Sequence, residues 1–297
     1  MVGKTTKAFL AALLLCGNLW GQEDLFDTLD EMQPEQENYA TATFKSTRIV
    51  NSPTIELTRP GELNFIVQHR FGTINSGLYD LFGIDNSEVR LAFDYGLTPF
   101  LMVGIGRSGG IKTYDANAKV RLLRQKEGGS PVTLAAYTAV AYDFNKSRPG
   151  EELDDVNRLS YVYELLVARK FSESLSLQLA PAFVHKNLVD SASFGNDFIA
   201  LGLGGRQKVS KRVSINLDYV YLLDNGNRDD IYNSIALGVD IETGGHVFSL
   251  HVTNSRGMAD RSYITETTGD ISDGDIYFGF NINRVFTVDK RKKAKGL

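Results

Sequence analysis

The sequence has little cysteine and proline, and it lacks an apolar run long enough for a membrane-spanning helix. Among its 297 residues are 1 Cys and 7 Pro, so no disulfide can form within the chain. The apolar run at residues 8–16 is too short to cross a bilayer as a helix, which takes about 20 residues. The formal net charge of -4 argues against nucleic acid as a partner.

What the sequence does have is glycine, aromatic residues and alternation. Its 28 Gly, 13 Tyr and 17 Phe favour many strands joined by tight turns. Residues 158–170 show the pattern clearly, with Leu159 and Tyr163 on one parity and Ser160 and Glu164 on the other. Because successive side chains of a strand point to opposite faces, this segment has one apolar face and one small or polar face.

The alternation recurs about twelve times and predicts as many strands. They are expected at residues 62–70, 88–96, 99–106, 114–124, 131–143, 158–170, 174–187, 196–208, 212–223, 232–242, 246–254 and 274–286. Most reach the length of about 9–11 residues that crosses a membrane in a barrel. Connections after odd-numbered strands average about twelve residues and those after even-numbered strands about three. This is typical of an all-β, closed antiparallel up-and-down transmembrane β-barrel with short periplasmic turns and long extracellular loops.

The two parities of these strands carry different side chains. One parity is apolar, as at Leu91, Leu165 and Leu217, and we expect it to face lipid. The other is ionic, and a single Arg or Lys at the midplane of the lipid face would cost about 2–4 kcal/mol. The candidate lumen-facing residues are therefore Arg70, Arg90, Asp94, Lys119, Arg121, Glu164, Asp218, Asp240, Glu242 and His251.

The segments outside the barrel, residues 62–286, have other compositions. Residues 1–21 predict a signal peptide, with a basic start, an apolar centre and a small-residue exit; a lipoprotein anchored at Cys16 is the alternative. Residues 22–61 begin as an acidic segment that predicts a flexible periplasmic leader. Their Thr-rich second part, residues 39–61, leaves an extra strand, a lumen plug and a periplasmic cap open. Residues 287–297 predict a solvated basic tail.

No motif predicts a catalytic residue, a cofactor site or a metal site. Residues 104–109 match G-x-G-x-x-G, but no helical pattern follows, so we expect a glycine-rich hairpin loop. The Asp-rich stretches 224–230 and 270–275 lack EF-hand spacing and predict turns. The four histidines are scattered. His69 has the lipid parity near a rim, where outer-membrane phospholipases use a catalytic base, yet no serine signature accompanies it.

Several short stretches resemble a known family. They are FKSTRIVN at 44–51, HRFG at 69–72, LFGID at 81–85 and DYGL at 94–97. The chain resembles the domain of unknown function 5777 family of outer-membrane β-barrel proteins of the Bacteroidota, from about residue 44 to residue 286. The resemblance implies an outer-membrane barrel and brings no assigned activity or catalytic residues. The closing strand, with Phe286 as its terminal aromatic residue, also looks like the signal read by barrel-insertion machinery.

These observations predict location more firmly than function. We expect an exported outer-membrane barrel, and a narrow or plugged pore for small solutes, because barrels of about 8 strands are filled and those of about 16–18 are open. The alternatives are a closed barrel that acts as a surface platform through its loops, a soluble periplasmic lipid-binding barrel, and an outer-membrane hydrolase. The expected partners are outer-membrane lipid and lipopolysaccharide, the barrel-assembly machinery and a small solute. No cofactor and no enzymatic activity are expected.

Overall fold

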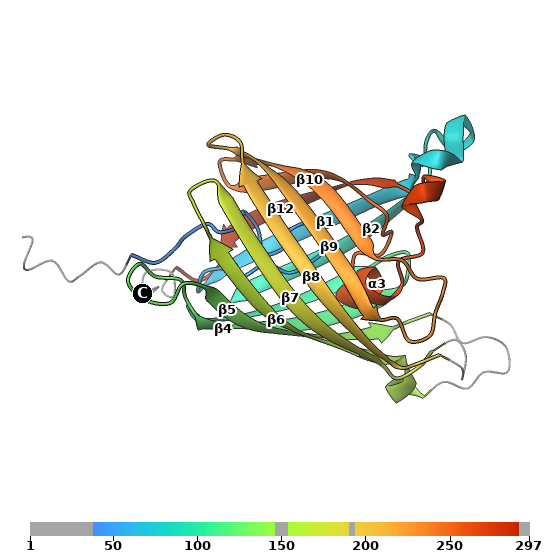
Figure 1. Cartoon of the computed structure of the whole chain (residues 1–297), viewed down its shortest axis with the longest axis horizontal. Coiled ribbons are helices and arrows are strands. Elements are labelled where there is room, and N and C mark those ends of the chain that lie inside the picture. The colour runs from blue at the N-terminus through green and yellow to red at the C-terminus, as the bar shows by residue number, and fades with distance from the viewer. Residues whose placement is uncertain (1–37, 146–153, 190–193, 291–297) are drawn as a thin grey trace, which may run out of the picture. The chain divides into compact units, whose positions relative to one another are not determined.

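The computed structural model of the chain describes residues 38–145, 154–189 and 194–290. In this part of the chain, twelve antiparallel strands form a closed barrel in which β1 pairs with β12 (Figure 1). The strands are β1 (Glu62–Thr73), β2 (Ser87–Gly96), β3 (Leu101–Ser108), β4 (Thr113–Leu123), β5 (Thr133–Asp143), β6 (Leu159–Lys170), β7 (Leu175–Lys186), β8 (Asp197–Lys208), β9 (Val213–Asp224), β10 (Ser234–Thr243), β11 (His246–Thr253) and β12 (Tyr277–Thr287). The predicted closed up-and-down barrel is confirmed. The expected signal peptide lies outside the described residues.

Side chains alternate between the outside and the inside of the barrel along each strand. On β6, Leu165 is 41% exposed, whereas its neighbour Glu164 is 7% exposed. On β2, Leu91 is 45% exposed and Arg90 is fully buried. The outer face is thus an apolar band and the inner face is polar, as lipid outside a barrel requires.

The connections differ in length at the two ends of the barrel. At the end that we call the long-loop rim lie residues 74–86, 109–112, 144–145, 154–158, 187–189, 194–196, 225–233 and 254–276. At the other end, the short-turn rim, lie residues 97–100, 124–132, 171–174, 209–212 and 244–245. The long loops contain the 3-10 helices η1 (Ile74–Asp80), η2 (Asp155–Arg158) and η3 (Ile271–Asp273) and the helix α3 (Asp260–Thr265). In the described part of the chain, no helix is long and apolar enough to cross a membrane.

Two segments fill the barrel interior. One is residues 43–58, which we call the lumen segment, and the other is α3, which lies within the ring of strands (Figure 1). Phe44, Ile49 and Ile55 of the lumen segment join Tyr263 and Ile264 of α3 in a cluster with inward side chains of the wall. The long loop at 254–276 therefore folds back into the barrel interior.

Two local expectations differ from the structure. The predicted strand at 274–286 begins only at Tyr277, because the Asp270 side chain accepts the Ser272 N–H and Gly274, at φ 80°, closes η3. The predicted strand at 99–106 is observed as β3 and continues to Ser108, so most of the glycine-rich stretch 104–109, including Gly104 and Gly106, lies in a strand and not in the expected hairpin loop. A Cβ at Gly104 would collide with the Asp94 carboxylate, and one at Gly106 with the Arg90 guanidinium. These glycines make room for charged wall side chains.

The apolar outer band predicts the effect of a charge placed on it. Leu165→Arg, at the middle of β6, should destabilise the folded barrel by about 2–4 kcal/mol, because the guanidinium would face hydrocarbon. The same change at Val209 in the short turn after β8 should cost about 1 kcal/mol or less. Equilibrium unfolding in lipid vesicles measures both. Equal costs at the two positions would contradict a lipid-facing band.

Candidate functional site

The barrel interior contains most of the predicted lumen-facing residues. Eight are 7% exposed or less, namely Arg70, Arg90, Asp94, Lys119, Glu164, Asp218, Asp240 and His251. Arg121 and Glu242 are half-buried near the short-turn rim. Five of the ten hydrogen-bond to or pair with the lumen segment, namely Arg70, Asp94, Lys119, Asp218 and Glu242. The wall and the lumen segment therefore share one polar network.

Asp218 on β9 binds a tight turn of the lumen segment. Its Oδ2 accepts the backbone N–H groups of Val50, Asn51 and Ser52 at 3.3, 2.8 and 2.9 Å. Its Oδ1 accepts the Ser52 hydroxyl at 2.6 Å. The turn is closed by the Ile49 N–H, which donates to the Ser52 carbonyl at 2.9 Å. Successive N–H groups form an anion-binding concavity, so the turn stabilises the charge of the wall carboxylate.

Lys119 on β4 binds carbonyl groups of the lumen segment, as Asp218 binds its N–H groups. Its ammonium donates to the backbone oxygens of Thr54, Glu56 and Thr47 at 2.7, 3.0 and 3.4 Å. Three donors on one ammonium thus meet three acceptors that belong to no strand ladder. An extended segment without a sheet partner needs such wall groups, because unpaired buried backbone groups are costly.

Two further wall residues complete the backbone contacts of this region. Gln178 on β7 accepts the Ile55 N–H at 2.9 Å and donates to the Pro53 carbonyl at 2.7 Å. Arg206 on β8 donates to the carbonyl groups of Ala42 and Thr43 at 2.7 and 3.1 Å. Acidic, basic and neutral side chains from several strands of the wall therefore bind this region.

A buried ion pair joins the lumen segment to α3. The Arg48 guanidinium forms two contacts with the Asp260 carboxylate, at 2.6 and 3.1 Å, in a bidentate arrangement. The Tyr137 hydroxyl accepts from Arg48 at 3.1 Å and donates to Asp260 at 2.5 Å. Burial alone would raise the pKa of Asp260, but the charges of Arg48 and Arg90 and the hydrogen bonds from Arg48 and Tyr137 together outweigh burial and hold that pKa below its ordinary value. Both groups therefore stay charged in the interior.

A second ionic cluster anchors the same loop to the wall. Glu266, at the end of α3, accepts from the Lys186 ammonium at 2.7 Å and lies 3.4 Å from the Arg261 Nε. Burial would raise the pKa of Glu266, but the charges of Arg261 and Lys186, together with hydrogen bonds from Lys186 and Ser262, outweigh it and lower the pKa to about 2. Arg261 also lies 3.7 Å from the Asp143 carboxylate at the end of β5.

The other motifs of the sequence do not combine into a chemical site. Asp224 accepts the Gly226 N–H and Asp230 pairs with Arg228, so residues 224–230 form the expected turn. His69 stacks on Phe280, with ring centroids 4.8 Å apart, and its Nδ1 has no hydrogen-bond partner in the described part of the chain. Among the same residues, no group of three or more His, Cys, Asp or Glu side chains could hold a metal ion.

Sequence reasoning missed Arg48, Tyr137 and Asp260, which form the centre of the interior. Arg48 and Asp260 lie outside the strands, where no periodicity predicts direction. Tyr137 lies on an inward position of β5, and its parity could have indicated this. Arg206 was likewise detectable from the polar parity of its strand.

Breaking the buried pair should be costly. Asp260→Asn leaves the Arg48 charge without its counterion and should lower the free energy of unfolding by about 3–5 kcal/mol. The double variant Arg48→Met/Asp260→Asn should recover much of this loss, because no buried charge stays unpaired. Denaturant titration in detergent measures both, with Asp230→Asn in an exposed loop as the matched control. A single variant as stable as the control would contradict a structural role for the pair.

The depressed pKa of Glu266 predicts a pH dependence. A carboxylate with a folded-state pKa below its unfolded value contributes stability above the unfolded value, and that contribution disappears as the pH falls through the folded pKa. Glu266→Gln should therefore cost about 1–3 kcal/mol at pH 7 and progressively less from about pH 5 down to about pH 2. Unfolding titrations across this range test it, with Glu127→Gln in a short turn as control. A cost that is independent of pH would refute the ion-pair explanation.

Comparison with known proteins identifies the family. The family model described as membrane bound beta barrel domain (DUF5777) matches residues 44–286, which confirms the resemblance seen in the sequence. No curated protein matches the chain. The fold is similar to three solved barrels. They are the NanC porin (8% identity, TM-score 0.49, covering 76% of this chain and 98% of that one), an outer membrane channel from Pseudomonas putida F1 (14%, 0.46, 78% and 97%) and outer membrane phospholipase A from Escherichia coli (10%, 0.42, 76% and 91%).

Likenesses at such low identities and TM-scores carry no argument about function. The family match is different in kind, because it spans more than half of the chain and coincides with the strands and the lumen segment. The chain therefore belongs to the family of the membrane-bound β-barrel domain DUF5777.

Proposed function

We propose that the protein is an outer-membrane pore for small solutes that its own lumen segment closes. The observation that carries this proposal is the way in which charged wall residues complete their hydrogen bonds. Lys119, Asp218 and Arg206 bind backbone groups of residues 42–58 and not countercharges on neighbouring strands. Removal of the segment would leave these side chains to water, which suits a hydrated lumen.

The strand number is compatible with such a lumen. Barrels of about 8 strands are filled by their own side chains, and those of about 16–18 strands leave an aqueous channel. The twelve strands described here enclose more than wall side chains can fill, and the lumen segment and α3 occupy the remainder. A pore of this size would be narrow and would admit small solutes.

The many polar contacts make the closed state the resting one. Each neutral hydrogen bond contributes about 0.5–1.5 kcal/mol net, and those to charged groups about 1.5–3 kcal/mol. Opening therefore requires a compensating interaction, supplied by a solute or by a force on the chain that precedes Tyr39. We place the short-turn rim in the periplasm, in line with the predicted export signal.

The location implies the other partners. The apolar outer band would contact outer-membrane lipid, with lipopolysaccharide at the long-loop rim, and Phe286 near the end of β12 would be read by the barrel-assembly machinery. Membership of a membrane-bound family leaves the soluble lipid-binding barrel without support. The His69 ring stacks on Phe280, and its Nδ1 has no hydrogen-bond partner among the described residues, so it gives no support to a hydrolase.

Conductance across a planar bilayer tests the pore. The whole chain should pass little current, whereas deletion of residues 22–58 should produce a stable ion current. Asp218→Ala, which removes the acceptor of the turn at residues 50–52, should open more often than wild type. Asp230→Ala in an exposed loop is the matched control and should behave as wild type.

Folding of each variant is verified first by heat-modifiable migration on a detergent gel. A deletion variant that folds and inserts but passes no current would overturn the pore.

One observation favours a second function. The lumen segment contributes Phe44, Ile49, Val50 and Ile55 to an apolar cluster, as a permanently closed barrel would require. Such a barrel would act as a surface platform through its long loops. The loop at 254–276 would contribute less than its length suggests, because Asp260, Tyr263 and their neighbours point inward.

A further inference from the structure

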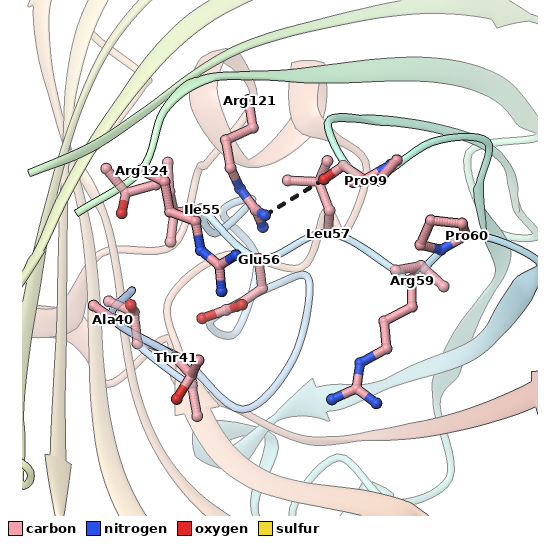
Figure 2. Close-up of a pocket in the computed structure, with 14 residues that line it drawn as sticks. Ala40, Thr41, Ile55, Glu56, Leu57, Arg59, Pro60, Pro99, Arg121 and Arg124 are labelled. Atoms are coloured by element: carbon pink, nitrogen blue, oxygen red, sulfur yellow. Dashed lines mark hydrogen bonds between the residues drawn. The ribbon is translucent and has the colours of Figure 1, made fainter. Parts of the chain in front are cut away.

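A cavity of about 370 Å³ opens at the short-turn rim beside the lumen segment. Residues 40–43 and 55–60 form one side of it, and Pro99, Arg121, Arg124 and Thr133 form the other. Figure 2 shows that Arg121 and Arg124 reach toward Glu56 from the wall and that Arg59 lies across the cavity. The volume falls within the range of about 300–1,000 Å³ that is usual for small-molecule sites.

The charge of this cavity is strongly positive. Its ionic lining consists of Arg59, Arg121 and Arg124 against one carboxylate, Glu56, which leaves two uncompensated positive charges. Glu56 is also engaged elsewhere, because its Oε1 accepts the Phe44 N–H at 3.1 Å. Positive potential within a concave, low-dielectric wall attracts anions.

The arginines keep donors for a ligand. Arg121 makes one long contact, from Nη1 to the Pro99 carbonyl at 3.5 Å. Arg124 stacks on the Tyr39 ring, with its central carbon 4.4 Å from the centroid. Stacking uses the face of the guanidinium, while the N–H donors lie in its plane. A fork of such donors matches the paired oxygens of a carboxylate or a phosphate.

We infer that this cavity binds a small anion through carboxylate or phosphate oxygens, with Arg121 and Arg124 as the principal donors and Arg59 as an outer contact. If the pore proposed above exists, this anion belongs to the class of solutes that pass through it. Only this statement about transport rests on the proposed function. The binding itself depends on the cavity alone.

Isothermal titration of the full-length protein in a zwitterionic detergent tests the inference. The probes are inorganic phosphate and succinate, each at low ionic strength and again in 0.5 M sodium chloride. We expect saturable binding of at least one probe that weakens in salt. Binding of phosphate alone or of succinate alone would identify which oxyanion the arginines select.

Substitutions locate the binding. Arg121→Gln should weaken the bound probe by about tenfold or more, because a charge-assisted donor is lost. Glu56→Gln should strengthen it, since the amide oxygen still accepts the Phe44 N–H while the competing charge is gone. Arg169→Gln, on the exposed face of β6 near the same rim, is the matched control and should leave the affinity unchanged.

Two results would overturn the inference. One is that neither probe binds wild type, and the other is that Arg121→Gln and Glu56→Gln both bind as wild type does. Because titration in detergent requires no transport, its outcome is separate from conductance. If the full-length protein binds a probe but the deletion variant passes no current, the pore is refuted and the anion site is kept. If the deletion variant passes current but the full-length protein binds neither probe, the anion site is refuted and the pore is kept.

Discussion

Charge that is buried inside a barrel must find a partner, and this constraint shapes the whole interior. The outer face is apolar, so ionic side chains in the middle of the strands, such as Arg90, Lys119 and Glu164, are directed inward. Inside, an isolated ion would lose several kcal/mol of hydration, and only hydrogen bonds or countercharges restore it. The Asp218 carboxylate is the clearest example, since it accepts hydrogen bonds from three N–H groups and one hydroxyl of a single turn.

The same constraint explains why the lumen segment has no regular secondary structure. Its backbone pairs with itself at the antiparallel bridge between Arg48 and Pro53. A helix or a longer hairpin would satisfy more of its own backbone and leave the wall charges without partners. Residues 43–58 instead present N–H groups to Asp218 and carbonyl groups to Lys119. The wall carboxylate thus accepts hydrogen bonds from N–H groups of the lumen segment, and the wall ammonium donates to its carbonyl groups. Wall charges and segment backbone satisfy each other.

Different parts of the structure were predictable to different degrees. The inward direction of Arg90, Lys119 and Asp218 follows from strand parity, because one apolar neighbour on each side fixes the outer face. The apolar band and the alternation of long and short connections follow from the same local period. Boundaries were less certain where turn chemistry decided them, as at Gly274, and the strand predicted at 99–106 ends later than expected, at Ser108.

Sequence alone therefore determined a closed barrel, its lipid-facing side and the inward set of charges, because strand periodicity depends only on neighbouring residues. Tertiary structure decided what those charges bind. Arg48 and Asp260 are 212 positions apart in the sequence, and the three arginines of the short-turn cavity come from two separate segments. Contacts between residues so far apart leave no periodic pattern in the sequence. Only closure of the barrel around the lumen segment could bring these residues together.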